Sequence, residues 1–192
     1  MGALVVFCAA CGDVKSASDV GNSAQDFTAR DAEGNTFRLS DHIGKQVVLI
    51  DFWATWCQPC LAEMPHLEKM YEQYKSQGLL VVAVSMDGPE SIADVPAFAK
   101  RNQMNFPVLL DEDSSIASIY NPRKSAPLSA IIDRNGRIAA VREGYNAGDE
   151  QFVLQDVQKA LGIAGTAPSA TQTQPTPAPS ATPESQPAPV AK

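Results

Sequence analysis

Residues 47–60, VVLIDFWATWCQPC, join a continuous apolar run to two cysteines that are separated by two residues. An apolar run of this length predicts a buried central strand over 47–53, interrupted only by Asp51. Downstream, apolar residues recur three or four positions apart and predict a helix with one apolar stripe, formed by Cys60, Met64, Leu67, Tyr71 and Tyr74. Pro65 lies within that helix and should kink it. The two cysteines therefore stand at a strand-to-helix turn.

The flanking sequence alternates strands and helices. A turn at 33–35 between short alternating segments predicts an N-terminal hairpin around Phe27 to Leu39. We expect further strands at 79–84, 107–110, 128–133 and 137–142, and helical segments at 94–102, 114–119 and 149–161. This alternation, which ends in a hairpin and a helix, predicts an α/β fold with a central mixed β-sheet and helices on both faces.

Composition divides the 192 residues into three parts. Residues 1–23 are an apolar start and a small polar tether, 24–163 form the folded domain, and 164–192 are rich in Pro, Ala, Thr, Ser and Gln. The last part holds seven of the chain's 14 prolines and should be disordered. The net charge of −7, without basic clusters, argues against nucleic acid as a partner.

The N-terminal segment contains a second cysteine pair, Cys8 and Cys11. An apolar run ending in Ala9 and Ala10 before Cys11 is similar to a bacterial lipobox, which implies that Cys11 is lipidated. No basic residue precedes the run, and Cys8 stands where a larger aliphatic residue is usual. The alternatives are a cleaved signal or an unremarkable terminus, and a second redox dithiol.

A C-x-x-C sequence at the start of a helix has a specific chemical use. The helix N-terminus stabilises an anion, so the pKa of Cys57 should fall below that of a free thiol. Cys60, one turn inside the helix, faces the apolar stripe and should stay protonated. An exposed attacking thiol and a buried resolving thiol are what thiol–disulfide exchange requires. A zinc half-site and a static disulfide are the alternatives, but a structural zinc site needs four ligands, and the domain has no second cysteine pair.

The run from Phe27 to Pro65 resembles the thioredoxin superfamily, and Gly44-Lys45 before the strand and Glu63-Met64-Pro65 after the motif resemble its TlpA/ResA branch. The resemblance implies a thioredoxin-like fold and an extracytoplasmic, membrane-tethered enzyme that reduces disulfides, in that branch commonly those of apocytochrome c or copper-site proteins. It assigns Cys57 as nucleophile and Cys60 as resolver. We expect a monomer without cofactor or metal, which a membrane partner supplies with electrons.

The same resemblance assigns a substrate groove. Pro127 matches the cis-proline that faces the dithiol, and the backbone of Ala126 would pair with a substrate strand. Trp56, Gln58 and Pro59 complete the expected substrate-binding residues. The alternative for Pro127 is an ordinary proline at the start of a strand. Ala126 and Leu128 stand where Thr is frequent in the branch, which changes the polarity of the groove.

Two carboxylates are candidates for proton transfer. Asp51 lies within an apolar strand, so burial should raise its pKa toward neutrality. Glu63 lies one turn beyond Cys60, at the margin of the apolar stripe. We expect Asp51 to be the principal base and Glu63 an auxiliary catalytic group. The alternatives are a structural buried acid for Asp51 and a solvated helix residue for Glu63.

Two other functions compete with disulfide reduction. Copper metallochaperones of this fold pair C-x-x-x-C with a downstream histidine, whereas this chain has C-x-x-C and no histidine after His66. A thiol peroxidase needs P-x-x-x-T-x-x-C, and Ala54 occupies the threonine position.

Overall fold

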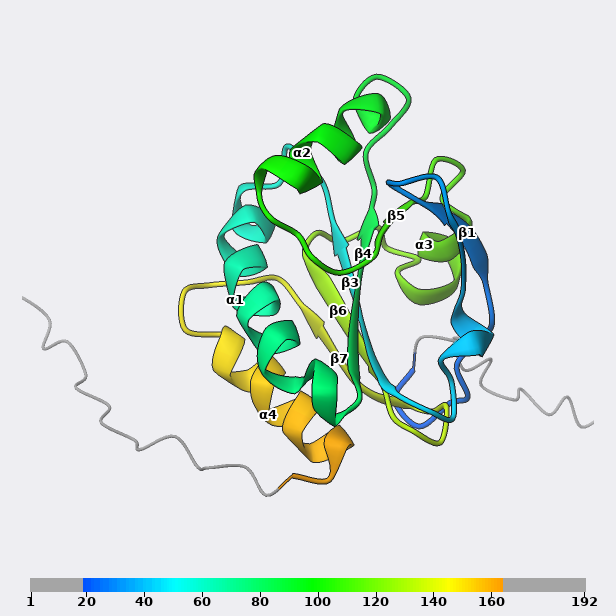
Figure 1. Cartoon of the computed structure of the whole chain (residues 1–192), viewed down its shortest axis with the longest axis vertical. Coiled ribbons are helices and arrows are strands. Elements are labelled where there is room, and N and C mark those ends of the chain that lie inside the picture. The colour runs from blue at the N-terminus through cyan, green and yellow to red at the C-terminus, as the bar shows by residue number, and fades with distance from the viewer. Residues whose placement is uncertain (1–18, 164–192) are drawn as a thin grey trace, which may run out of the picture.

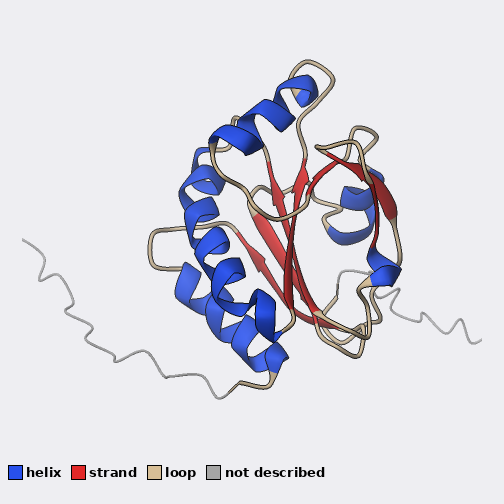
Figure 2. Cartoon of the chain, viewed as in Figure 1, coloured by secondary structure: helices blue, strands red, loops and turns tan. Residues whose placement is uncertain are grey.

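The computed structural model describes residues 19–163. Cys8, Cys11 and the Pro-rich tail lie outside this range, so the lipidation and disorder expected for them stay predictions. The described chain folds around one seven-stranded sheet (Figures 1 and 2). Its strands are β1 Thr28–Asp31, β2 Thr36–Arg38, β3 Val47–Trp53, β4 Leu79–Ser85, β5 Val108–Leu110, β6 Leu128–Ile132 and β7 Ile138–Glu143.

The strand order is β2-β1-β5-β4-β3-β6-β7. β3, β4 and β5 are parallel to one another, whereas the β1–β2 hairpin and the β6–β7 hairpin join them through antiparallel pairings. The predicted N-terminal hairpin is confirmed, and it extends the sheet beyond β5. The sheet is therefore mixed, as the sequence predicts.

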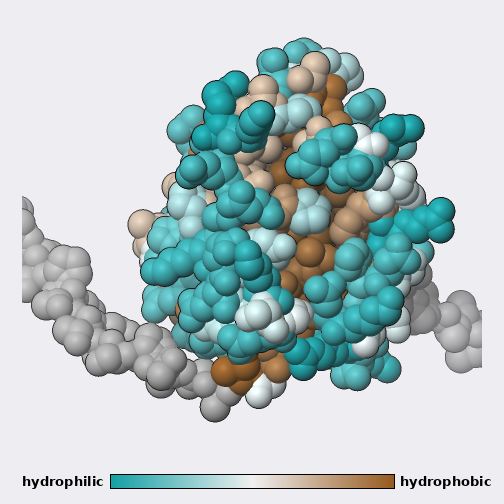
Figure 3. Space-filling model, viewed as in Figure 1, coloured by the Kyte–Doolittle hydropathy of each residue, from teal (hydrophilic) through white to brown (hydrophobic). Residues whose placement is uncertain are grey.

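Helices cover both faces of the sheet (Figure 1). One face packs against α1 Gln58–Tyr74, α2 Val95–Arg101 and α4 Glu150–Leu161, and the other against α3 Ser115–Tyr120 and a short 3-10 helix, η1 Leu39–Asp41. Two further 3-10 turns, η2 Lys75–Gln77 and η3 Ile92–Asp94, follow α1 and precede α2. Hydrophilic side chains cover most of the face in view, and apolar ones show in a strip down its middle (Figure 3).

The centre of the fold follows directly from the apolar run. All seven residues of β3 are buried, because β4 and β6 flank the strand and helices cover it on both sides. α1 continues through Pro65 as a single helix over 17 residues. Its buried residues include Cys60, Met64, Leu67 and Tyr74 from the predicted stripe, together with Glu63 and Met70.

Strand direction gathers several loops at one end of the sheet. β3 and β4 are parallel and paired from Val47↔Leu79 to Trp53↔Ser85, so the residues that follow both strands lie side by side. β6 runs antiparallel to β3, with Phe52 opposite Leu128, so the residue before β6 lies beside the end of β3. The C-x-x-C turn and Pro127 therefore meet at this end.

Candidate active site

Cys57 and Cys60 form a disulfide at the start of α1, with a Cα–Cα distance of 5.3 Å. Cys57 is the N-cap residue, and its Sγ accepts a hydrogen bond of 3.3 Å from the backbone N–H of Cys60. Pro59 occupies the first turn, where a helix leaves backbone N–H groups without internal acceptors. The first sulfur therefore lies at the positive end of the helix dipole.

The sequence predicts that Cys57 is exposed. For the disulfide form seen here, that prediction is wrong. Cys57 is 4% exposed and Cys60 is fully buried, because the S–S bond holds both side chains against the helix and the core. The rim of the site is instead formed by Trp56, Gln58 and Pro59, which are all exposed. Trp56 is 62% exposed, an unusual position for a large aromatic side chain, whereas Trp53 is fully buried.

Pro127 follows a cis peptide bond from Ala126, as the resemblance implied. It lies directly before β6, next to the end of β3, and its carbonyl accepts a 2.8 Å hydrogen bond from Gly144 N–H. Pro127 is buried and Ala126 is half-buried against the core under α1. The cis-proline segment and the dithiol turn thus belong to one end of the molecule.

Asp51 is 1% exposed in the middle of β3. The hydroxyl of Ser129, directly opposite in β6, donates a 3.0 Å hydrogen bond to Oδ1, and within residues 19–163 the buried Oδ2 has no partner. Burial raises the pKa of Asp51 to about 7, although the bond from Ser129 acts in the opposite direction. The side chain is thus able to exchange a proton near neutral pH.

Glu63 is 3% exposed, which contradicts the alternative of a solvated helix residue. Glu63 lies on the buried side of α1, and its buried Oε2 has no hydrogen-bond partner within the described chain. Burial, followed by the negative charge of Asp51, raises the pKa of Glu63 to about 8. Glu63 lines a pocket of about 330 Å³ together with Pro127, Ser129, Gly144, Tyr145 and Asp149. Two buried acids with raised pKa values therefore influence each other near the dithiol.

Asp87, which the sequence analysis did not select, anchors the loop before Cys57. It is 2% exposed just after β4, and its carboxylate accepts hydrogen bonds from Thr55 N–H (3.0 Å), Thr55 Oγ1 (2.5 Å), Ser85 Oγ (2.9 Å) and Ser91 Oγ (2.9 Å). Burial acts to raise the pKa of Asp87, but these bonds outweigh it and leave the pKa below its ordinary value. A charged residue two positions beyond the end of a buried strand was the available sequence signal.

Within the part of the chain that the structure describes, no group of three or more His, Cys, Asp or Glu side chains is arranged to hold a metal ion. His66, the only histidine near the site, lies 4.0 Å from Glu150 and is half-exposed. The reactive groups that this end of the molecule brings together are the two sulfurs and the acids behind them.

No helix among residues 19–163 is long and apolar enough to cross a membrane.

A mixed sheet covered by helices on both faces, with a cysteine pair at the start of α1 opposite a cis-proline, defines a thioredoxin-like thiol–disulfide oxidoreductase. The chain belongs to the AhpC/TSA family, which it matches over residues 20–141.

Among its relatives are the thiol–disulfide oxidoreductases ResA of two bacilli. The chain is 38% identical to ResA of Geobacillus kaustophilus over 130 residues, which is 68% of this chain and 72% of that protein. It is also 38% identical over 130 residues to ResA of Bacillus subtilis, covering 68% of this chain and 70% of the relative.

Solved structures show the same architecture. A putative thiol:disulfide interchange protein DsbE from Chlorobium tepidum has a TM-score of 0.69 at 35% identity and covers 75% of this chain and 99% of that one. The exposed lipoprotein thioredoxin Etrx1 of Streptococcus pneumoniae has a TM-score of 0.60 at 29% identity, with coverage of 70% and 99%.

Proposed function

We propose that the protein reduces disulfide bonds in other proteins outside the cytoplasm, with Cys57 as the attacking thiolate and Cys60 as the resolving thiol. The observation that carries the proposal is the placement of the two sulfurs on α1. Cys57 is the N-cap, where the helix dipole and the Cys60 N–H stabilise a negative sulfur, whereas Cys60 is fully buried. The two thiols are therefore suited to different steps.

The exchange then proceeds in two steps. The Cys57 thiolate attacks one sulfur of the substrate disulfide, which forms a mixed disulfide and releases the other substrate sulfur as a thiolate that takes up a proton. Cys60 loses its proton and attacks the Cys57 sulfur, which restores the Cys57–Cys60 disulfide and releases the second substrate thiol. The substrate gains two electrons from the enzyme dithiol and two protons; Cys60 gives up one proton, and the solvent supplies the other, which Cys57 released when it ionised. A dithiol donor, which we propose to be a membrane protein, must then reduce the enzyme.

The second step needs a base for the buried Cys60 thiol. Asp51 suits this role because its pKa, raised to about 7, allows it to be ionised and to accept a proton near neutral pH. Glu63 is buried on the same helix as Cys60, one turn away, and its charge is coupled to that of Asp51. We therefore assign Asp51 as the principal base and Glu63 as its auxiliary.

Substrate binding is assigned to the surface around the dithiol. Trp56, Gln58 and Pro59 are exposed beside Cys57, and they offer apolar area without charge. Ala126 and Pro127 provide the opposite side, where a substrate strand would pair with backbone groups. This chemistry fits an extended protein segment that carries a disulfide, and apocytochrome c is a candidate substrate.

A trapping experiment tests this function. A Cys60→Ala variant in the native host should hold substrate proteins as mixed disulfides with Cys57, and mass spectrometry identifies them. A Cys57→Ser, Cys60→Ala double variant is the control and should hold none. Equal recovery with both variants would contradict the proposal. Rapid reaction of Cys57 with hydrogen peroxide, or tight binding of copper(I) without disulfide exchange, would favour the peroxidase or the metallochaperone instead.

We propose from the sequence around Cys11 that the protein lies outside the cytoplasm, anchored to a membrane. Its lipobox-like surroundings favour a lipid anchor that holds the domain at the outer face of a membrane, and a relative of the same fold carries the description of an exposed lipoprotein. The protein expressed with its native upstream sequence should partition into detergent and carry the added mass of acyl chains, whereas Cys11→Ser should not. An unmodified Cys11 in the intact mass would contradict the anchor.

We also propose that the protein is a monomer, and gel filtration should show the mass of a single chain.

A further inference from the structure

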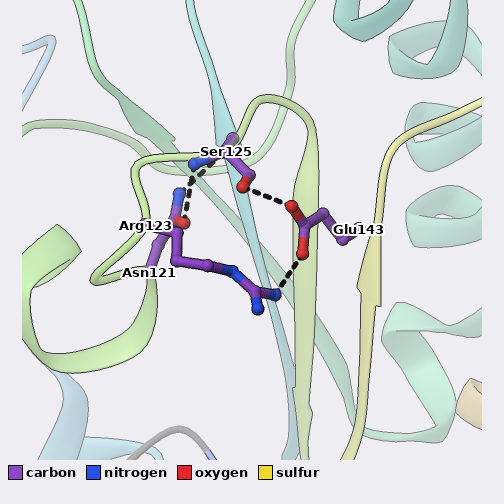
Figure 4. Close-up of polar contacts among 4 residues, drawn as sticks. All are labelled: Asn121, Arg123, Ser125 and Glu143. Carbon is purple, nitrogen blue, oxygen red and sulfur yellow. Dashed lines mark hydrogen bonds and ion pairs between the residues drawn. The ribbon is translucent and has the colours of Figure 1, made fainter.

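Polar side chains hold the loop before the cis-proline from both sides (Figure 4). Asn121, at the end of α3, is fully buried, and its amide bonds to both backbone polar groups of Ser125. The Ser125 N–H donates to Asn121 Oδ1 at 2.9 Å, and Asn121 Nδ2 donates to the Ser125 carbonyl at 2.7 Å. The Asn121 amide thus provides the hydrogen-bond partners that neighbouring backbone would provide for Ser125 in a helix or strand.

Glu143 holds the same loop from β7. It is the last residue of that strand, opposite Leu128 in β6, and its carboxylate accepts a 2.5 Å hydrogen bond from Ser125 Oγ and forms an ion pair with Arg123. The bond from Ser125 and the charge of Arg123 hold the pKa of Glu143 below its usual range. Glu143 is therefore ionised at neutral pH, and the four residues Asn121, Arg123, Ser125 and Glu143 form what we term the clamp.

Among the three residues around the cis peptide bond, Ser125, Ala126 and Pro127, the clamp and β7 leave only Ala126 with free backbone groups in the described chain. Both backbone polar groups of Ser125 are bound to Asn121, Pro127 has no N–H, and the Pro127 carbonyl is bound to Gly144. By contrast, the N–H and the carbonyl of the half-buried Ala126 have no hydrogen-bond partner within residues 19–163. The fixed residues on either side set the direction of these two groups.

We propose that Asn121 and Glu143 are positioning residues for the protein substrate, which hold the Ala126 backbone in the orientation that pairs with the substrate strand beside the target disulfide. The inference rests on the proposed reduction of protein disulfides. A loop that is already ordered loses less entropy when it binds a strand, so the clamp strengthens substrate capture. A small disulfide has no strand to pair, and its reduction does not use the clamp.

Substitutions on the exposed side of the clamp test this proposal without opening the core. Ser125→Ala and Glu143→Gln should each lower the second-order rate constant for reduction of insulin by about 5- to 30-fold, less than the roughly 10- to 150-fold effect of a fully lost hydrogen bond to a charged group, because Asn121 still holds the loop. The rate constant with the small disulfide 5,5′-dithiobis(2-nitrobenzoate) and the pH profile of Cys57 alkylation should stay unchanged. Ser125→Thr keeps the hydroxyl donor and should restore the rate with insulin.

Matched controls are Ser118→Ala on α3 and Glu72→Gln on α1, which remove a hydroxyl and a carboxylate from exposed positions away from the loop. Unchanged insulin rates in both clamp variants, or equal losses with insulin and the small disulfide, would overturn the proposal. Cys57→Ser is compared with the wild type beforehand. If the two reduce insulin equally slowly, the proposed function fails and the clamp proposal falls with it. If Cys57→Ser is much slower than the wild type but both clamp variants reduce insulin at the wild-type rate, the proposed function stands and the clamp proposal alone is wrong.

Discussion

Asp51 and Ser129 face each other across the β3–β6 pairing, and the Ser129 hydroxyl donates to only one of the two buried carboxylate oxygens of Asp51. A buried carboxylate with a single hydrogen bond is destabilised as an anion, because the low-dielectric interior replaces the water that would solvate it. Asp51 therefore resists ionisation until neutral pH, unlike Asp87, whose carboxylate accepts four hydrogen bonds.

We expect Asp51→Asn to slow disulfide reduction by roughly 10- to 1000-fold, because an amide does not accept the Cys60 proton. Stopped-flow mixing of reduced protein with a disulfide substrate between about pH 5 and 9 measures the rate. Asp41→Asn is a control, since Asp41 lies exposed on η1. An unchanged rate and pH profile in Asp51→Asn would make the residue structural and leave Glu63 or solvent as the base.

The stability of the oxidised protein should fall as the pH rises from about 4 to about 7. In this window the folded protein retains the proton on Asp51, whose pKa is raised from 3.8 to about 7, while the unfolded chain has lost it. The stabilisation that Asp51 contributes is fully present at pH values below its pKa in the unfolded chain, and it is lost as the pH rises through its pKa in the folded protein. Asp51→Asn should remove the part of this slope that Asp51 contributes, leaving the part from Glu63, and should stabilise the protein at pH 8 by on the order of 2–4 kcal/mol.

Urea unfolding of wild type and variant at several pH values measures this difference. A variant that is less stable than the wild type at pH 8, or that keeps the same slope between pH 4 and 7, would contradict the raised pKa of Asp51.

Glu63→Gln should reduce the rate less than Asp51→Asn, and it should also change stability. The helix pattern alone suggests a solvated residue with little effect on stability, but Glu63 is buried and its pKa is raised to about 8. The neutral amide should therefore stabilise the fold above pH 8, with the gain disappearing below about pH 4.5, where both states are protonated. Because Asp51 raises the pKa of Glu63, the two substitutions should not be additive.

Thermal unfolding of both single variants and the double variant at pH 9 checks this coupling. Strict additivity of the changes in unfolding free energy would show that the two acids do not interact.

In the reduced protein, iodoacetamide should alkylate Cys57 well before Cys60, because the helix N-terminus stabilises only the first thiolate and Cys60 lies in the core. Timed quenching followed by peptide mass spectrometry distinguishes the two sites, and a denatured sample, in which both cysteines should react alike, is the control. Faster labelling of Cys60 would reverse the assignment of attacker and resolver.

Asp87→Asn should destabilise the protein by about 1–3 kcal/mol, since the amide cannot accept all the hydrogen bonds that Thr55, Ser85 and Ser91 donate. Asp94→Asn is the matched control, because Asp94 lies nearby without a side-chain capping bond. Urea unfolding gives the difference. Equal stabilities would mean that the contacts of Asp87 contribute no net free energy.

The core elements could be predicted from sequence because their signals are local. The run over Val47–Trp53 is a continuous apolar pattern and the stripe along α1 is a periodic one, and the structure confirms the buried strand and the helix that they predict. The polar anchors have no such pattern: Asp87 contacts Thr55 across 32 positions, and Glu143 contacts Ser125 across 18. The degree of burial of Glu63, at the margin of the stripe, could not be predicted, because it depends on the elements packed around α1, which the helix period does not reveal.

The burial of the Cys57–Cys60 pair in the cluster between α1 and the sheet links the redox state of the protein to its folding through a thermodynamic cycle. Oxidising the dithiol in the folded and in the unfolded chain, and unfolding each form, are the four sides of that cycle. Any difference in unfolding free energy between the two redox forms therefore equals a shift in reduction potential, at about 30 mV for each 1.4 kcal/mol. Every residue that packs differently around the two redox forms thereby sets the reducing strength of the enzyme.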